Sequence, residues 1–185
     1  SRMSKPPSEE KKGRNWRRIC LFSGAVALLS VIAFWLWLPA YGLNTAKRFL
    51  RWKFDDIHHI TTVELAAQMK GENPPAILDI RRPEEYETSH LPNARHLLPE
   101  STDAQIQKLL SGIPAKRPIV VYCSVGYRSS TMARRLKALG RVNVSNLEGS
   151  IFAWAVNGHS LESRDEIHPY NWFGRRMIPD KLEAD

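Results

Sequence analysis

Residues 118–140 read PIVVYCSVGYRSSTMARRLKALG, and this stretch decides the fold class of the chain. The uninterrupted, β-branched run 118–123 predicts a strand that is buried on both faces. A helix is expected over 129–140, where the final glycine closes it. A buried strand that leads directly into a helix is typical of an α/β fold, in which helices cover both faces of a mainly parallel sheet.

The chain from residue 61 onward shows the same alternation of helices and short apolar strands. Further strands are expected at 76–80, 94–97 and 142–147, and further helices at 63–69, 83–89, 102–110 and 151–157. About 100 residues are enough for one hydrophobic core of this kind and too few for two. The sequence therefore predicts one α/β domain over residues 61–160.

The loop between the strand and the helix of 118–140 carries Cys123, with Gly126 and Arg128 three and five residues later. Such a loop turns backbone N–H groups toward one point, and the following helix adds its positive end. This setting lowers a thiol pKa from about 8.5 toward neutrality and populates the nucleophilic thiolate. Glycine permits a positive φ, and arginine offers a planar fork for the oxygens of an oxyanion. A cysteine taken alone is more often an inert core residue, but this combination favours a nucleophile.

Three motifs make the chain resemble the rhodanese-like family of sulfurtransferases over residues 61–160. The family's active-site loop, Cys-x-x-Gly-x-Arg followed by small hydroxyl residues, stands here as CSVGYRSS, residues 123–130. Its upstream signature stands as ILDIRRPEEYETSHLPNA (77–94), and its downstream signature as NLEGSIFAW (146–154). Ser150 replaces the second glycine of the downstream signature. Because Ser150 lies outside the loop, we expect only a local backbone adjustment there.

The resemblance implies a rhodanese-like fold and a persulfide relay on Cys123. The thiolate would take the outer sulfur of a thiosulfate-like donor, and a thiol or another nucleophile would collect it. A substrate-binding role is implied for the residues that follow: Ser124, Val125, Gly126, Tyr127, Arg128 and Ser129. This chemistry requires no metal and no organic cofactor. Asp79 and Arg81 are expected to support the surroundings of the loop, and His90 to form a turn.

Two other classes of function remain open for this chain. Cysteine-dependent phosphatases and arsenate reductases on related folds use a Cys-x5-Arg loop, one residue longer than the loop here. Tyr122, where many phosphatases have histidine, also argues against that class. The second alternative is a catalytically silent rhodanese-like binding module. Such modules commonly lack the cysteine, and Cys123 is present with Gly126 and Arg128.

Basic residues flank a long uncharged stretch near the start of the chain. Residues 1–18 hold seven basic and two acidic groups, and no Asp, Glu, Lys or Arg occurs from 19 to 46. This pattern predicts a basic tail (1–18) and one transmembrane helix (19–41), and it argues against a nucleic-acid partner. A cleaved secretory signal is the alternative. The larger number of basic residues before the helix places the domain on the non-cytoplasmic side.

The segments on either side of the predicted domain are less informative. The juxtamembrane segment 42–60 alternates basic and aromatic residues, which suits a helix at the membrane surface; a solvated connector is the alternative. The tail 161–185 contains HPYNWFG (168–174), for which the sequence offers no mechanism. The two cysteines, Cys20 and Cys123, allow no disulfide within the domain. The expected partners are a sulfur donor, a thiol acceptor and the membrane.

Overall fold

The computed structural model describes residues 9–184, except for the side chains at 9–15, 17–19, 37–40 and 173. The chain divides into two compact units, residues 1–38 and Pro39–Asp185. Helix α1 (Glu9–Lys53) makes up the described part of the first unit. The last turns of the same helix belong to the second unit. Residues 1–8 of the predicted basic tail lie outside the described residues.

The predicted transmembrane helix over 19–41 is not confirmed. The described side chains from 20 to 36 are exposed. Among the described residues, however, no single helix has the length and apolar character needed to cross a bilayer. Two stretches separated by a bend, Cys20–Leu36 and Tyr41–Lys53, together have the length and the apolar composition of a membrane span, but neither has them alone.

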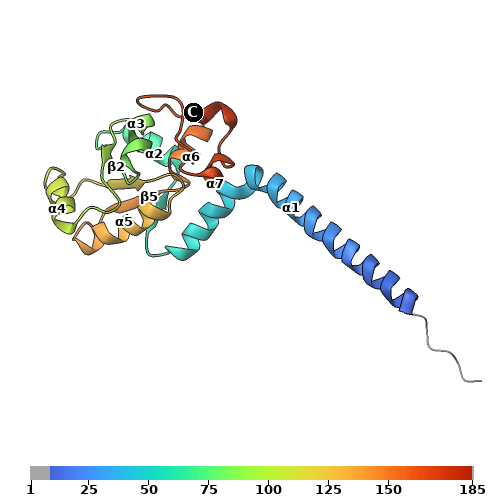
Figure 1. Cartoon of the computed structure of the whole chain (residues 1–185). Coiled ribbons are helices and arrows are strands. Elements are labelled where there is room, and N and C mark those ends of the chain that lie inside the picture. The colour runs from blue at the N-terminus through green and yellow to red at the C-terminus, as the bar shows by residue number, and fades with distance from the viewer. Residues whose placement is uncertain (1–8, 185) are drawn as a thin grey trace, which may run out of the picture. The chain divides into compact units, whose positions relative to one another are not determined.

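A five-stranded parallel sheet forms the centre of the second unit (Figure 1). The strands lie in the order β1-β5-β4-β2-β3, and each neighbouring pair is parallel. Their bounds are β1 (His58–Ile60), β2 (Ala76–Asp79), β3 (Arg95–His96), β4 (Ile119–Tyr122) and β5 (Val144–Leu147). Every residue of β2 and β4 is buried, as expected for strands covered on both faces. This confirms the predicted α/β fold.

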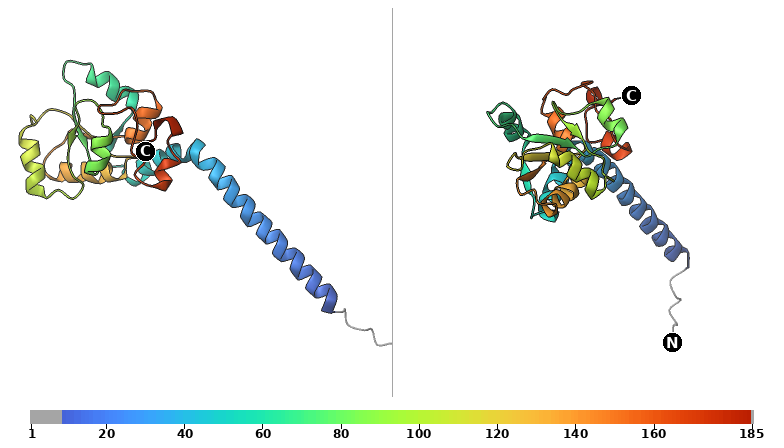
Figure 2. Two further views of the ribbon diagram at one scale, coloured as in Figure 1. Left: turned by 45° about the horizontal axis from the view of Figure 1, so that its top comes forward. Right: turned by 90° about the vertical axis from the view of Figure 1, so that its left-hand side faces the viewer.

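Helices cover both faces of this sheet (Figures 1 and 2). The last turns of α1 pack on one face together with α4 (Asp103–Ser111) and α5 (Tyr127–Ala138), through a shared apolar core. On the other side lie α2 (Thr62–Met69), α3 (Pro83–Thr88) and α6 (Ser150–Val156). Two short helices follow near the C-terminus, α7 (Trp172–Arg175) and η1 (Asp180–Leu182).

The segments on either side of residues 61–160 differ from the expectation, because both take part in the folded unit. In the juxtamembrane segment, Leu50 and Phe54 are 4% and 2% exposed, and β1 adds an edge strand to the sheet. This segment therefore packs on the domain and is not a solvated connector. In the segment 161–185, Ile167 and Ile178 are buried as well.

Candidate active site

Cys123 follows directly after β4, at the carboxyl end of a central strand of the sheet. Helix α5 begins at Tyr127, two residues earlier than the sequence predicts, with Gly126 as its N-cap residue. Gly126 has φ of +131°, a backbone conformation that residues with a Cβ rarely adopt. The chain therefore turns from strand to helix within Ser124–Gly126, and the positive end of α5 lies beside the cysteine.

The sulfur of Cys123 lies within this tight turn. Gly126 N donates to Sγ at 3.2 Å, and Ser129 Oγ lies 3.5 Å from Sγ. Burial alone would raise the pKa of the thiol. The charge of Arg128, the Ser129 hydroxyl and nearby backbone amides outweigh burial, so the pKa is lowered. The residue is thus a buried thiol whose surroundings favour the thiolate.

Ser129 connects the sulfur to the neighbouring strand. Its hydroxyl lies 2.6 Å from Asn146 Oδ1, and Asn146 Nδ2 lies 3.2 Å from His59 Nδ1. A hydroxyl has one hydrogen, so it donates either to Asn146 or to the sulfur. When the thiol ionises, turning this hydrogen toward the sulfur stabilises the thiolate.

The guanidinium of Arg128 is bonded to two neighbouring side chains, Glu85 and Ser124. Nη1 and Nη2 each donate to one oxygen of Glu85 at 2.8 Å, and Nη2 also donates to Ser124 Oγ at 2.8 Å. Glu85 accepts further bonds from Ser124 Oγ at 2.8 Å and from Arg82 N at 3.0 Å. The fork that the sequence assigns to donor oxygens is therefore engaged by a buried carboxylate. Glu85 is not among the residues predicted for the site, because nothing in the sequence distinguishes it from the other acidic residues of the upstream signature.

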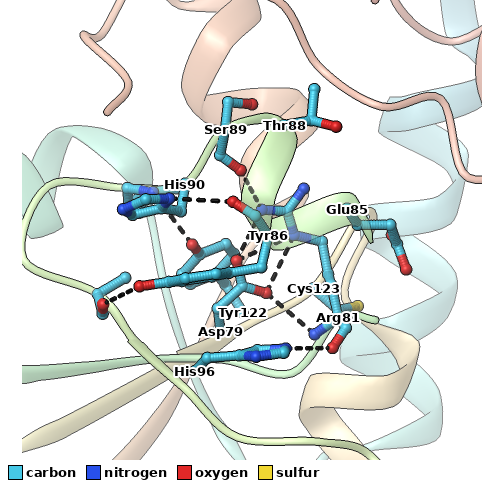
Figure 3. Close-up of polar contacts among 12 residues, drawn as sticks. Asp79, Arg81, Glu85, Tyr86, Thr88, Ser89, His90, His96, Tyr122 and Cys123 are labelled. Atoms are coloured by element: carbon cyan, nitrogen blue, oxygen red, sulfur yellow. Dashed lines mark hydrogen bonds and ion pairs between the residues drawn. The ribbon is translucent and has the colours of Figure 1, made fainter. Parts of the chain in front are cut away.

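Asp79 and Arg81 form a fully buried ion pair, with an Nη2 to Oδ2 distance of 2.7 Å (Figure 3). Arg81 Nη2 also donates to Ser89 O, which follows the last residue of α3. Because Glu85 lies on α3, this ion pair holds the helix that carries the partner of Arg128. Neither residue of the pair has a polar contact with Cys123 among those that the structure describes, in agreement with the expected supporting role.

An aromatic stack completes these surroundings (Figure 3). The ring of Tyr86 stacks on His90 with centroids 4.1 Å apart and on His96 with centroids 4.6 Å apart. His90 pairs its backbone with Glu162, so it joins the turn after α3 to the C-terminal segment. Tyr122 OH accepts from Leu91 N at 3.0 Å, and burial raises the pKa of Tyr122. The contacts of Tyr86, His90 and Tyr122 hold the turn after α3 in place, and they act at a distance from the sulfur of Cys123.

Ser150, in the second glycine's position of the downstream signature, contacts the nucleophile directly. Its hydroxyl accepts from Cys123 N at 3.1 Å and donates to Leu147 O at 3.2 Å. Its φ is +52°, a value that favours glycine. Ser150 lies outside the loop along the chain, as stated above, but it does more than adjust the local backbone, because its hydroxyl contacts the residue that carries the nucleophile. Only the fold brings this hydroxyl to the backbone of Cys123.

The last turns of α1 lie against the turn that holds the cysteine. A Cβ built on Gly126 would lie 3.0 Å from Leu50 Cδ1. The rings of Phe54 and Tyr127 meet edge to face, with centroids 5.5 Å apart. Arg51 pairs with Glu148 of the downstream signature, and its Nη2 lies 2.5 Å from Oε2. The segment predicted to lie on the membrane surface is thus a wall of the site.

The structure brings all the predicted site residues into one short turn and the first turn of α5. Ser124 and Ser129 are buried, Val125 is half-buried, and Tyr127 is 50% exposed. Within residues 9–184, no three His, Cys, Asp or Glu side chains are placed to hold a metal ion. The site consists of a thiol, the amides and hydroxyl around it, and a charged pair behind it.

This fold and this site define a class of protein: α/β domains that hold an activated cysteine after a central parallel strand. Residues 61–157 match the rhodanese-like domain family, and the chain belongs to this family. The match agrees with the family that the sequence motifs indicate.

Three known proteins illustrate the similarity. A sulfurtransferase of Allochromatium vinosum is 31% identical over 106 residues, which cover 55% of this chain and 92% of that protein. The probable adenylyltransferase/sulfurtransferase MoeZ of Mycobacterium tuberculosis is 32% identical over 96 residues, 52% of this chain and 24% of that protein. The solved rhodanese-like domain from Anabaena sp. is 25% identical, with a TM-score of 0.51, and the match covers 58% of this chain and 80% of that domain. The similarity to MoeZ therefore concerns one part of a longer protein.

Proposed function

We propose that this protein is a sulfurtransferase that carries a sulfane sulfur as a persulfide on Cys123. The observation that supports this most directly is the sulfur itself, 3.2 Å from Gly126 N in a turn that lowers the pKa of the thiol. Relatives named as sulfurtransferases agree with this reaction class.

In the first half-reaction, the Cys123 thiolate attacks the outer sulfur of thiosulfate. A new S–S bond forms, the bond between the two thiosulfate sulfurs breaks, and its electron pair leaves with sulfite. The persulfide Cys123–S–S⁻ remains. The amides at the start of α5 stabilise the negative charge both before and after this transfer.

In the second half-reaction, an acceptor thiolate attacks the outer sulfur of the persulfide. The S–S bond of the persulfide breaks, the Cys123 thiolate is regenerated, and the acceptor leaves as a persulfide. No net oxidation occurs, because each step exchanges one sulfur–sulfur bond for another. The thiolate that leaves in this step has a lowered pKa, which makes it a good leaving group.

Arg128 contributes to this reaction through its charge. Its fork is bonded to Glu85 and Ser124, so it stabilises the thiolate from a fixed position. Four hydrogen bonds to the Glu85 carboxylate hold that position.

We also propose that the uncharged stretch between residues 19 and 46 attaches this domain to a membrane, with the domain on the non-cytoplasmic side. Basic residues at both ends of that stretch support the attachment. Protein that stays in the membrane fraction after an alkaline carbonate wash would support it, and release by that wash would refute it. Protease added to intact spheroplasts should cleave the domain, and full protection would place it on the cytoplasmic side.

The test of the sulfurtransferase reaction is intact mass spectrometry after incubation with thiosulfate. Wild-type protein should gain one sulfur and release sulfite, and Cys123→Ser should do neither. Cys20→Ser is the matched control, because Cys20 is the other cysteine of the chain and is exposed. It should behave as wild type.

Two results would replace the proposal with another function. Release of phenol from an aryl phosphate that depends on Cys123, without sulfur transfer, would indicate a phosphatase. Absence of both activities across several donors would indicate a silent binding module.

A further inference from the structure

Residues 161–184 are folded against the domain, although no role could be predicted for them from the sequence. The backbone of Ile167 pairs with that of Leu182 and Ala184, which closes the segment on itself. Ile167 is fully buried, and Met177 and Ile178 are 8% and 5% exposed. The loop between these anchors contains the HPYNWFG motif, residues 168–174.

This loop brings one aromatic ring to the active site. The guanidinium carbon of Arg128 lies 4.4 Å from the centroid of the Tyr170 ring. Arg128 is therefore held in two ways: its edge is bonded to Glu85 and Ser124, and one face is covered by an aromatic ring. A cation over a tyrosine ring at this distance is an attractive arrangement.

The backbone of Tyr170 is strained. Its φ is +65°, in the left-handed region that non-glycine residues seldom occupy. Such a conformation persists only where the surroundings impose it. Here Tyr170 N donates to His168 Nδ1 at 3.1 Å, and the following turn is closed by a bond from Gly174 N to Asn171 Oδ1 at 2.8 Å.

The same loop is connected to the backbone beside the nucleophile. A Cβ built on Gly174 would collide with Pro169 O and lie 3.3 Å from the Phe152 ring, so glycine is required there. Phe152 N in turn donates to Ser124 O at 3.2 Å. The position of Tyr170 is thus set by residues that also hold the active-site turn.

We propose that Tyr170 is a positioning residue of the active site, which covers Arg128 and keeps its guanidinium against Glu85 and Ser124. It acts on the nucleophile through Arg128 and has no bond to the sulfur. This inference rests on the proposed function only in taking Cys123 as the nucleophile.

The reactivity of Cys123 at different pH values reports on this arrangement. The charged and titratable groups around the sulfur and Arg128 include the Glu85 carboxylate, Tyr170 itself and, through Asn146, His59. From α1, Lys53 Nζ lies 5.0 Å from the centroid of the Tyr127 ring. The positive charge of Arg128 opposes burial and favours the thiolate. If Arg128 loses the ring that covers it, water reaches the guanidinium and weakens both its bonds to Glu85 and Ser124 and the action of its charge on the sulfur, so the thiolate is less favoured.

The experiment measures the rate of alkylation of Cys123 by iodoacetamide between pH 5 and 10 in a Cys20→Ser background, in the full chain. Tyr170→Phe keeps the ring and should match the parent. Tyr170→Leu keeps apolar packing but lacks a π face, and it should be alkylated about threefold more slowly at pH 7, with the midpoint of the profile moved to higher pH. Trp172→Ala, which removes a more exposed aromatic from the same segment, is the matched control.

An unchanged profile in Tyr170→Leu would overturn the proposal. So would equal losses in Tyr170→Phe and Tyr170→Leu, because the loss would then follow the hydroxyl rather than the ring. Tyr170→Ala provides the same comparison if the leucine variant does not fold, as judged by circular dichroism. Alkylation requires no sulfur donor, so the result stands even if the protein transfers no sulfur.

Discussion

Leu50 lies directly on Gly126: a Cβ on that glycine would come within 3.0 Å of Leu50 Cδ1. Leu50 belongs to α1, and Gly126 is the N-cap of α5 and the last residue of the turn beside Cys123. The nucleophile's turn therefore has a wall that lies outside the residues matched by the family, 61–157.

Leu50→Ala should lower the free energy of unfolding by about 2–4 kcal/mol, because it leaves a cavity at a side chain that is 4% exposed. Urea unfolding measures this loss. Trp52→Ala, on the same helix but 77% exposed, should change the free energy by no more than about 0.5 kcal/mol. Equal effects of the two changes would mean that Leu50 does not pack on the domain.

Arg128→Ala should destabilise the fold as well as the thiolate, by about 3 kcal/mol, because it leaves the Glu85 carboxylate buried without its partner. Adding Glu85→Gln should recover most of this loss, since the buried group is then neutral. Arg135→Ala breaks an exposed ion pair with Asp103 and should cost no more than about 1 kcal/mol. If Arg128→Ala leaves stability unchanged, Arg128 is not engaged by Glu85 and is available to the donor.

Glu85 should make stability depend on acid pH. Burial alone would raise the pKa of this carboxyl, but the bonds and charge of Arg128, with bonds from Arg82 N and Ser124, lower it. Since the folded pKa lies below the unfolded value near 4.3, the stabilisation is present above about pH 4.3 and is lost as pH falls through the folded pKa. The stability difference between wild type and Glu85→Gln should therefore shrink on acidification. Glu84→Gln, at an exposed neighbour, should show no such trend.

Ser150 combines a useful hydroxyl with an unfavourable backbone, and two substitutions separate these effects. Ser150→Ala removes the acceptor for Cys123 N and keeps the positive φ, so it should cost about 1–3 kcal/mol. Ser150→Gly loses the same bond but relieves the backbone, so it should be about 1 kcal/mol more stable than the alanine variant. Thermal unfolding of the three proteins gives the comparison. Equal stability of the alanine and glycine variants would show that φ at this position carries no strain.

The strand, the turn and the helix around Cys123 could be predicted because local sequence determines them. The run 119–122 is apolar and β-branched, and Gly126 marks the turn. The start of α5 could not be placed so well, since neither Tyr127 nor Arg128 is a residue that marks the first turn of a helix. Helix ends are set by capping geometry, here by the positive φ of Gly126.

Contacts between distant segments could not be read from composition. Glu84, Glu85 and Glu87 look alike in the sequence, and only the packing of α3 selects Glu85 as the partner of Arg128. For the end of α1 and the turn after it, a pattern was present: Leu43, Lys47, Leu50, Phe54 and Ile57 repeat at spacings of four and three residues, as one face of a helix does, although α1 itself ends at Lys53. Arg48, Arg51 and Lys53 lie between these positions, and their charge favoured the prediction of a helix at the membrane surface instead.

The pairing of β1 with β5 joins His58 to Ser145, and 87 positions separate them along the chain. At a synthesis rate of about 5–20 residues per second, β1 leaves the ribosome on the order of ten seconds before its partner strand exists. During that interval Leu50 and Phe54 are exposed on a nascent chain that has no sheet to receive them. The wall of the active site is thus made well before the strand that completes its sheet. Asn146 and Ser150, which contact Ser129 and Cys123, are made later than the cysteine itself, so the surroundings of the thiol are complete only after β5 and the start of α6 have been synthesised.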